Sequence, residues 1–463
     1  MSEKLSKIFS FLKNQNIYWF TIISISGSFL ACFTGVWAIV IIAAVILLLI
    51  ILSNPKFGIF VLLFLTLGLT QSTAELTKSE IIFSGFFSSV VIGWVLHQLL
   101  KKKLVINRSS LNLPIFLFST ICIFSFIPAL YNNVNIIDWF VEWRVFLVLI
   151  LFFIILSEFR SRKELKWLIY CFLLTTALIC LQGIFLVIQR GGFERVWEVA
   201  GIQYASLFFI HAIPFSIAIF LTTKNFWIKW LQIPLILLFI FRLSLSLMRS
   251  YAFVLLVILA IFGATLIFLK NKKIFFQTIT LIVLTCIISG IAFLVFPTKI
   301  NRIIQNNITR FVVLKDFYSL QNISALTRIV ETEAAWNYAL QQPLLGHGFG
   351  FKYSYYRPDQ KLYEISFVHF TPLFFFLKIG FVGLLLIIWL VIQVLSLNWQ
   401  VFKEEKDLSW KLLELALFSN FIGFIVLSLF ITSVIRIDSL FYFTLAMGII
   451  AVMKKNKSKY YGE

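Results

Sequence analysis

The chain has 463 residues, of which 60% are hydrophobic and only 13% are charged. Soluble globular proteins are about 45–50% apolar and about 25% charged, so this composition excludes a soluble fold and predicts a protein embedded in lipid. The net charge of +20 does not indicate nucleic acid, because the basic residues stand in short clusters between apolar runs. The cysteines lie inside those runs without metal-type spacing, and we interpret them as small hydrophobic residues.

Apolar runs follow one another along almost the whole chain, and most are long enough to span a bilayer. The first run continues into the second, so we expect no cleavable signal peptide. The run at 57–69 has the length of half a span. The sequence predicts an all-α, polytopic membrane bundle of about 12–14 transmembrane helices. The expected runs are 17–33, 36–52, 57–69, 81–100, 113–130, 139–156, 166–188, 204–221, 228–248, 250–268, 274–296, 367–396, 411–431 and 436–453.

The distribution of charge predicts the orientation of the bundle. With the N-terminus inside and alternating crossings, every inside loop carries at least one Lys or Arg. The short outside loops are poor in basic residues, and several carry acids such as Glu75, Glu80 and Asp138. Cytoplasmic loops of membrane proteins are enriched in Lys and Arg, so we expect both termini to lie in the cytoplasm.

Two outside segments are longer than a simple turn, 189–203 and 297–366. Within the second, the apolar spacing from Ser324 to Gln342 predicts an amphipathic helix that Pro343 ends. The following stretch PLLGHGFGF has glycines at every second position from 346 to 350, which predicts a tight, exposed turn. The expected organisation is a transmembrane bundle over 1–296, an extracytoplasmic loop over 297–366, and C-terminal transmembrane helices with a basic cytoplasmic tail over 367–463.

Three arginines stand within or at the outer ends of spans, where a charge is expensive and marks a candidate site. Arg144 could instead form a local pair with Asp138 or Glu142. Arg242 and Arg249 are seven residues apart, or two helical turns, so we expect both to project from one face and to form a site for an anion such as phosphate. The alternatives are contact of Arg249 with lipid headgroups and pairing of Arg242 with an acid elsewhere.

Among the four histidines, His369 is the candidate for chemistry, because it stands where the long outer loop re-enters the membrane. A neutral imidazole at a wet boundary suits proton transfer, although a structural role is the alternative. His347 in the glycine stretch could be solvated, and Lys378 has no evident partner. Glu331 and Glu333 would point to different sides of a helix, so we expect no metal site there.

Three stretches together resemble the O-antigen ligase and O-antigen polymerase superfamily of bacterial membrane glycosyltransferases. SLSLMRSYAFVLL is similar to its Ser-x-Ser-Arg motif, with Met248 where a small or polar residue is commoner. LTRIVETEAAWNYALQQPLLGHGFG is similar to its Arg…Trp…Pro-x-x-Gly-x-Gly stretch, which His347 interrupts. SFVHFTPLFFFLKIGFVGLL is similar to its histidine followed by a glycine-bearing helix. The resemblance covers about 240–390.

The resemblance implies a GT-C-like fold in the bacterial inner membrane and a transferase that uses no metal or other cofactor. The donor would be a glycan on undecaprenyl pyrophosphate, transferred with inversion to an acceptor hydroxyl of a glycan or lipid core on the outer side. Arg249 and Arg328 would stabilise the departing pyrophosphate, with Arg242 and Arg144 in support, and His369 would be the base.

Ligase and polymerase differ only in the acceptor, and this sequence does not distinguish them. A lipid-linked oligosaccharide flippase is the main alternative from another class. It would also keep arginines for pyrophosphate, but it would not need the outer loop at 297–366, and the inverted repeats frequent in transporters are not evident here. A metal-dependent glycosyltransferase is disfavoured because the first outside loop has no acidic pair.

Overall fold

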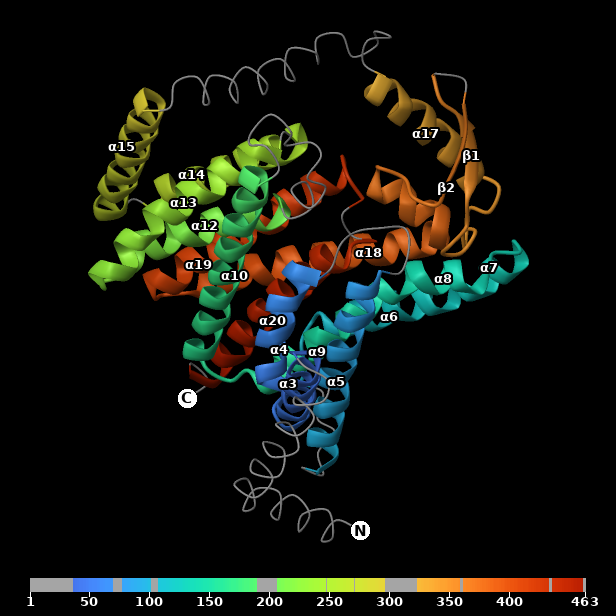
Figure 1. The fold of residues 1–463 in the computed structure, drawn as a ribbon, viewed down its shortest axis with the longest axis horizontal. Helices are drawn as coiled ribbons and strands as arrows, with labels where there is room; N and C mark the ends of the chain where they lie inside the picture. Colours follow the sequence, from blue (N-terminus) through green and yellow to red (C-terminus); the bar gives the residue numbers. More distant parts are fainter. Residues whose placement is uncertain are drawn as a thin grey trace.

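The computed structural model describes residues 36–69, 77–100, 107–189, 206–246, 248–269, 271–295, 323–358, 361–432 and 435–460. These residues are almost entirely helical (Figure 1). The first half contains α3 (Val36–Ser53), α4 (Pro55–Leu69), α5 (Lys78–Leu100), α6 (Asn112–Phe124), α7 (Phe126–Tyr131), α8 (Ile136–Trp143), the 3-10 helix η1 (Arg144–Leu149), α9 (Ile150–Glu158) and α10 (Arg162–Gln189). The second half contains α12 (Ser206–Thr222), α13 (Phe226–Ser246), α14 (Arg249–Phe268), α15 (Lys272–Val295), α17 (Ile323–Ala339), α18 (Thr371–Glu404), α19 (Leu408–Ser428) and α20 (Ile437–Tyr460).

The prediction of an all-α polytopic membrane protein is confirmed. Within the described ranges, nine helices are long and apolar enough to cross a membrane, and three shorter apolar helices accompany them. The short run expected at 57–69 is the 15-residue helix α4. The run expected at 17–33 lies outside the described residues.

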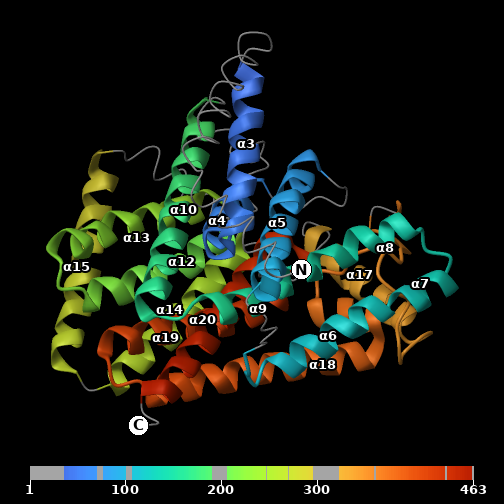
Figure 2. The ribbon, with the colours of Figure 1, turned by 90° about the horizontal axis from the view of Figure 1, so that it is seen from below.

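The core of the bundle is built around the C-terminal helices. α20 is the most deeply enclosed of the candidate spans and packs against α9 and η1, while α19 packs against α12 and α14. The long helix α18 lies beside α6, as both views show (Figures 1 and 2), and its N-terminal part also packs against α17. Residues from the last quarter of the chain therefore hold the earlier helices together.

The helix expected from Ser324 to Gln342 is confirmed as α17, which begins at Ile323 and ends at Ala339. After the glycine stretch comes a small antiparallel hairpin, which the sequence did not predict. It is formed by β1 (Tyr353–Tyr356) and β2 (Leu362–Ile365), with Tyr353 opposite Ile365. α17 and the hairpin lie together over the N-terminal end of α18 (Figure 1).

The glycine stretch forms a turn, but the expectation that it is exposed is wrong. Residues 346–350 are all buried, and their three glycines have positive φ angles between 67° and 88°. A Cβ atom on Gly348 would lie 2.5 Å from Ala129. Only glycine allows so close an approach of backbones in this conformation. His347 is likewise buried rather than solvated, with Nε2 2.7 Å from the carbonyl oxygen of Tyr338.

The glycine turn is packed against a break in α18. Gly380 has φ 65° and ψ −169°, so the helix is interrupted there. The backbone N–H of His347 donates to Leu377 O at 2.9 Å, and that of Gly348 donates to Lys378 O at 2.8 Å. In return, the N–H of Phe381 donates to Pro343 O at 2.8 Å. The turn thus satisfies backbone groups that the break would otherwise leave unpaired in an apolar environment.

Candidate active site

His369 is hydrogen-bonded to the buried carboxylate of Glu331, which the sequence did not single out as a site residue. Its Nδ1 lies 2.9 Å and 2.8 Å from the two carboxylate oxygens of Glu331, and its backbone N–H donates to Glu331 Oε1 at 2.7 Å. The Glu331 side chain is 1% exposed, whereas that of His369 is 35% exposed. The histidine is therefore fixed from its inner side and accessible from its outer side.

The local chain explains this arrangement. His369 lies two residues before α18, in the short segment that joins the hairpin to that helix. Glu331 lies in the middle of α17, on the side of the helix that faces the protein, while Glu333 is exposed. The expectation that these two glutamates point to different sides is confirmed. Glu331 could have been found from its position one turn after Arg328, on the buried face of a helix that also bears site residues.

The carboxylate determines which nitrogen of His369 can take a proton. A neutral imidazole that donates Nδ1–H to a carboxylate has its free electron pair on Nε2. Glu331 also lies close to the hairpin: burial raises the pKa of Tyr353 and Tyr355, and the neighbouring Glu331 carboxylate raises the pKa of both further. Because the free electron pair is on Nε2, this nitrogen of His369 can accept a proton, as a general base must.

Arg328 lies close enough to Glu331, and Arg249 close enough to Arg328, for their charges to interact, and we call these residues together with His369 the cluster. Arg328 remains accessible to solvent, but the protein atoms around it lower the pKa of its guanidinium. The Glu331 carboxylate acts in the opposite direction, and the charge of Arg249 is close enough to lower the pKa of Arg328 as well. Two positively charged guanidinium groups near a single carboxylate leave a net positive charge, and such a region suits a multiply charged anion.

The N-terminus of α14 adds to this positive region. Arg249 is the first residue of the helix, and the preceding residue, Met248, has an extended conformation without a side-chain cap. The first backbone N–H groups of such a helix are not used within it, and the helix dipole places partial positive charge there. A guanidinium and a helix end thus occupy one place, which is a common setting for a phosphate.

A cavity of about 680 Å³ is lined by Arg328 and by residues that directly follow His369, whereas His369, Glu331 and Arg249 are not part of its lining. Arg328, Thr332 and Trp336 of α17 form one wall, and Phe370 and Pro372, which follow His369, lie on the other. A second, almost entirely apolar cavity of about 180 Å³ lies between α6, α18, α19 and α20. Both cavities are lined by Pro372 and Leu384, so an apolar space adjoins the polar one.

The structure does not bring Arg144 into this cluster. Its Nη2 forms a buried salt bridge with Glu80 Oε2 at 2.9 Å. The alternative of a local pair with Asp138 or Glu142 is also wrong, because Asp138 pairs with Lys352 at 2.8 Å and Glu142 pairs with Lys378 at 3.0 Å. The partner of Arg144 comes from α5, 64 residues earlier in the chain, and no local pattern points to it.

Arg242 is also placed differently from the expectation. α13 ends at Ser246 and α14 begins at Arg249, so the spacing of seven residues does not put the two arginines on one helical face. Arg242 is 1% exposed, and its guanidinium lies 5.5 Å from the ring centroid of Phe209. A Cβ atom on Gly183 would meet this guanidinium, so the glycine makes room for it. These neighbours belong to α12 and α10, and neither of them is part of the His369–Glu331 pair.

No group of three or more His, Cys, Asp or Glu side chains placed to hold a metal ion occurs in the described part of the chain. The acidic residue nearest to His369, Glu331, is used in the pair with the imidazole. The residues that could hold an anionic ligand are Arg249 and Arg328.

Comparison with known proteins identifies the segment that carries this cluster. A search of curated proteins finds no match. Residues 233–388, however, match the family described as O-antigen ligase. The matched segment begins in α13, ends in α18, and contains Arg249, Arg328, Glu331 and His369. It supports glycosyl transfer of the ligase or polymerase type in general terms. Residues 233–388 of this chain are therefore similar to the O-antigen ligase family.

Proposed function

We propose that this protein transfers or polymerises a surface polysaccharide, taking a glycan from undecaprenyl pyrophosphate and passing it to an acceptor hydroxyl at the extracytoplasmic face. The observation that carries the proposal is the His369–Glu331 pair beside Arg328 and Arg249. A glycosyl transfer that expels a pyrophosphate needs a base for the acceptor and cations for the leaving group, and both are in this cluster.

The chemistry follows from the charges. The acceptor hydroxyl gives its proton to Nε2 of His369 as its oxygen attacks the anomeric carbon, and Glu331 stabilises the resulting imidazolium. The bond from the anomeric carbon to the phosphate oxygen breaks, and Arg249 and Arg328 stabilise the negative charge that gathers on the pyrophosphate. Attack from the face opposite the leaving group inverts the anomeric centre. These two arginines supply the positive charge, so the reaction proceeds without a metal ion.

The two adjoining cavities support a lipid-linked donor. The cavity lined by Arg328 has room for the pyrophosphate and sugar, and the apolar cavity that shares Pro372 and Leu384 with it would receive the first part of the polyprenyl chain. A membrane-embedded site is what such a donor requires, because its hydrocarbon tail stays in the bilayer.

The proposal is tested by reconstitution of the purified chain in liposomes with a glycan on undecaprenyl pyrophosphate and two acceptors, a lipid-core glycan and a second lipid-linked repeat unit. Product length distinguishes ligase from polymerase, and the anomeric configuration of the product tests inversion. Transfer should continue in the presence of a chelator. Loss of activity that added metal restores would contradict the role given to the arginines.

The variant His369→Ala should abolish transfer while the protein still inserts and elutes as the wild type does. His97→Ala is the matched control, because His97 also lies near a carboxylate, with Nδ1 3.5 Å from Glu158 Oε1, but it is outside the cluster. If His369→Ala retains wild-type turnover, His369 is not the base. If neither acceptor is used by the wild type while lipid-linked glycan crosses the bilayer, the protein is a flippase.

A further inference from the structure

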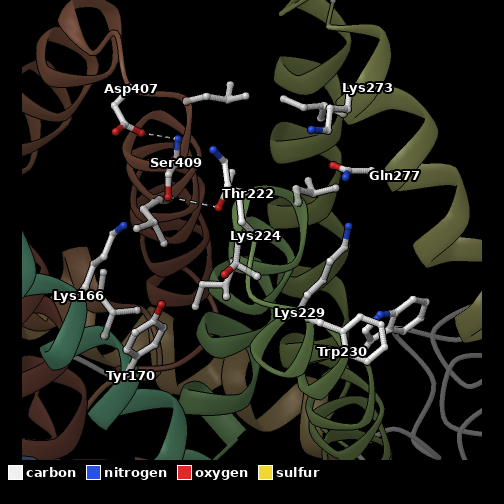
Figure 3. Close-up of a pocket in the computed structure, with 18 residues that line it drawn as sticks. Lys166, Tyr170, Thr222, Lys224, Lys229, Trp230, Lys273, Gln277, Asp407 and Ser409 are labelled. Carbon is white, nitrogen blue, oxygen red and sulfur yellow. Dashed lines mark hydrogen bonds between the residues drawn. The ribbon is translucent and has the colours of Figure 1, made fainter.

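A second charged cavity lies at the opposite end of the bundle from the candidate active site. It has a volume of about 790 Å³ and is lined by residues of α10, α12, α13, α15 and α19 and of the segment that joins α12 to α13 (Figure 3). α13 begins at this cavity with Phe226 and ends at Ser246, three residues before Arg249. A helix of that length spans about 30 Å, so the two cavities face opposite leaflets of the membrane.

The cavity is strongly basic. Four lysines line it, from four different segments of the chain, and Figure 3 shows Lys166 and Lys273 approaching from opposite walls. Among the described residues that line it, Asp407 is the only carboxylate. It already caps α19, because its Oδ1 accepts the N–H groups of Ser409 at 2.8 Å and Trp410 at 3.3 Å. The four lysines are Lys166, Lys224, Lys229 and Lys273.

Three other basic residues at this end of the molecule are paired with acids. Lys56 pairs with Glu164 at 2.7 Å, Arg162 with Glu405 at 2.9 Å, and Lys454 with Glu404 at 2.6 Å. In contrast, the ammonium group of Lys166 lies 5.4 Å from the ring centroid of Trp410. Within the described residues, neither Lys166, Lys224 nor Lys273 forms a salt bridge with a carboxylate. The charges of Lys166, Lys224 and Lys273 can therefore attract an anion that comes from outside the chain.

The lining also offers hydrogen bonds of the kind that phosphate oxygens accept. The hydroxyl of Ser409 lies 3.3 Å from that of Thr222, and both line the cavity with the amide of Gln277. α13, α15 and α19 all begin here, and the N-terminal end of each helix adds partial positive charge. Lysines, hydroxyl groups and helix ends together favour phosphate over a carboxylate of a folded protein.

The surroundings indicate that the phosphate belongs to a lipid. Trp230, which lines the cavity, is 40% exposed, and Phe226 beside it is 63% exposed. Exposed aromatic side chains at helix ends are typical of the boundary between membrane and water. On α15, Phe276 is 65% exposed next to Lys273 and Gln277, so an apolar surface continues from the basic one. Basic pockets between transmembrane helices bind the headgroups of anionic lipids.

We propose that this cavity binds the phosphate headgroup of an anionic phospholipid from the leaflet opposite the candidate active site. The headgroup lies among Lys166, Lys224, Lys229 and Lys273, and the acyl chains run along the exposed apolar faces of α13 and α15. Since Lys273 belongs to α15 and the other lysines do not, the lipid joins this peripheral helix to the rest of the bundle.

The test uses the full-length protein, delipidated in detergent and studied by native mass spectrometry with defined lipids. Phosphatidylglycerol and phosphatidylcholine with identical acyl chains serve as the anionic and zwitterionic probes, and sodium pyrophosphate serves as the free anion. The wild type should bind phosphatidylglycerol more tightly than phosphatidylcholine. The variant Lys224→Gln/Lys229→Gln/Lys273→Gln should lose this preference, with affinity falling about fivefold for each lysine removed.

Two further variants distinguish the pocket from general surface charge. Lys163→Gln/Lys403→Gln/Lys411→Gln removes the same charge at the same end of the bundle but outside the cavity, and should bind as the wild type does. Replacing the three pocket lysines by Arg should retain the preference. If the Gln variant does not elute as a folded protein, Lys224→Gln alone, in the segment between α12 and α13, is measured in its place.

The proposal is overturned if the wild type binds the two phospholipids equally, or if the pocket and control variants lose affinity to the same extent. A lipid ligand is also excluded if the pocket lysines are needed for pyrophosphate binding while neither phospholipid is preferred over the other. That result would assign the cavity to a soluble phosphate compound.

Discussion

Glu331 fixes the orientation of the His369 imidazole ring, which a histidine without such a partner would lack. The carboxylate accepts both the ring Nδ1–H and the backbone N–H of the same residue, at 2.8–2.9 Å and 2.7 Å. The imidazole is held against rotation through Nδ1, and the side chain as a whole remains 35% exposed. Such a buried carboxylate fixes both the tautomer and the orientation of a base without touching the substrate.

We therefore expect Glu331→Gln to lower kcat by roughly 10²–10⁴-fold with little change in KM, since a glutamine can donate to Nδ1 and place the hydrogen on the wrong nitrogen. Transfer assays at saturating donor and acceptor measure the effect. Glu364→Gln, at an exposed position of β2 and outside the cavity lined by Arg328, is the matched control and should retain wild-type turnover. A Glu331→Gln protein as active as this control would show that the carboxylate has only a structural role.

At the scale of single residues, the sequence indicated the candidates that stand in local motifs and missed contacts that depend on the fold. Arg249, Arg328 and His369 stand in motifs, and they fall in one cluster. We considered Glu331 only as a possible metal ligand. Its hydrogen bond with His369 could not be foreseen, because the two residues are 38 positions apart in the chain. Arg242 was assigned by helical spacing, and this failed because the helix ends at Ser246, before Arg249 is reached.

At the scale of elements, the break in α18 is the feature on which the site depends. The first part of this helix begins two residues after His369, and the glycine turn holds it through hydrogen bonds to Leu377 and Lys378. Gly380 has a positive φ, and a Cβ atom there would meet the carbonyl group of Leu344. The sequence predicted both a turn and a glycine-bearing helix. Hydrophobic periodicity and helix propensity do not reveal, however, that the glycine turn packs into the break of α18.

Gly380→Ala should therefore lower the thermal midpoint of the detergent-solubilised protein and reduce transfer. The left-handed conformation costs a residue with a Cβ atom about 1–2 kcal/mol, and the contact with Leu344 adds to this. Gly263→Ala in α14 is the control, because a Cβ atom there meets nothing within 4 Å. Alanine favours a helix over glycine, so the control should melt at the wild-type temperature or slightly above it. Equal midpoints for the two variants would show that the break is not needed.

A buried ion pair ties the same region to α8. Lys378 is fully buried, and its ammonium group lies 3.0 Å from Glu142 Oε2 and donates to Phe351 O at 2.7 Å. Glu142 also accepts the N–H of Gly350 at 2.7 Å. One carboxylate thus joins α8, the glycine turn and α18. The sequence showed Lys378 deep in a span but gave no partner, because Glu142 lies 236 residues earlier.

Removing one member of this pair should destabilise the protein strongly. We expect Lys378→Met to lower the free energy of unfolding by about 3–5 kcal/mol, because it leaves the largely enclosed Glu142 carboxylate without its cation. Adding Glu142→Gln to Lys378→Met should recover part of the loss. In the exposed pair of Lys352 and Asp138, the change Lys352→Met should cost about 1 kcal/mol or less. Unfolding in mixed detergent micelles measures all four proteins, and equal losses at the two pairs would contradict this account.

At the scale of the whole molecule, the bundle has two ends of different character. The end with His369, Arg328 and Arg249 also carries α17 and the hairpin, while the other end carries the lysine-lined cavity. Hydropathy predicted the helical bundle, because apolar runs of about 20 residues have few other structures available in lipid. The order in which α6, α18, α19 and α20 pack could not be predicted from one sequence, since neighbouring helices there are similarly apolar.

The positive-inside rule then predicts which end faces the cytoplasm, and one crossing is enough to test it. The span Ile136–Glu158 joins the segment after α7 to the segment before α10. Tyr131, at the end of α7, is 81% exposed, and Ser161, just before α10, is exposed as well. Because Arg160, Arg162 and Lys163 surround Ser161, we expect this residue to lie in the cytoplasm and Tyr131 to lie outside.

In a protein whose native cysteines have been replaced by Ala, we expect Tyr131→Cys to react with a membrane-impermeant maleimide in intact cells. Ser161→Cys should react only after the membrane is permeabilised. Labelling of both variants in permeabilised cells controls for accessibility. The reverse pattern would place His369 and the two arginines on the cytoplasmic side, where a donor already carried to the outer leaflet could not reach them. The proposed transfer would then fail, whereas binding of an anionic lipid in the lysine-lined cavity could still be measured, in the outer leaflet.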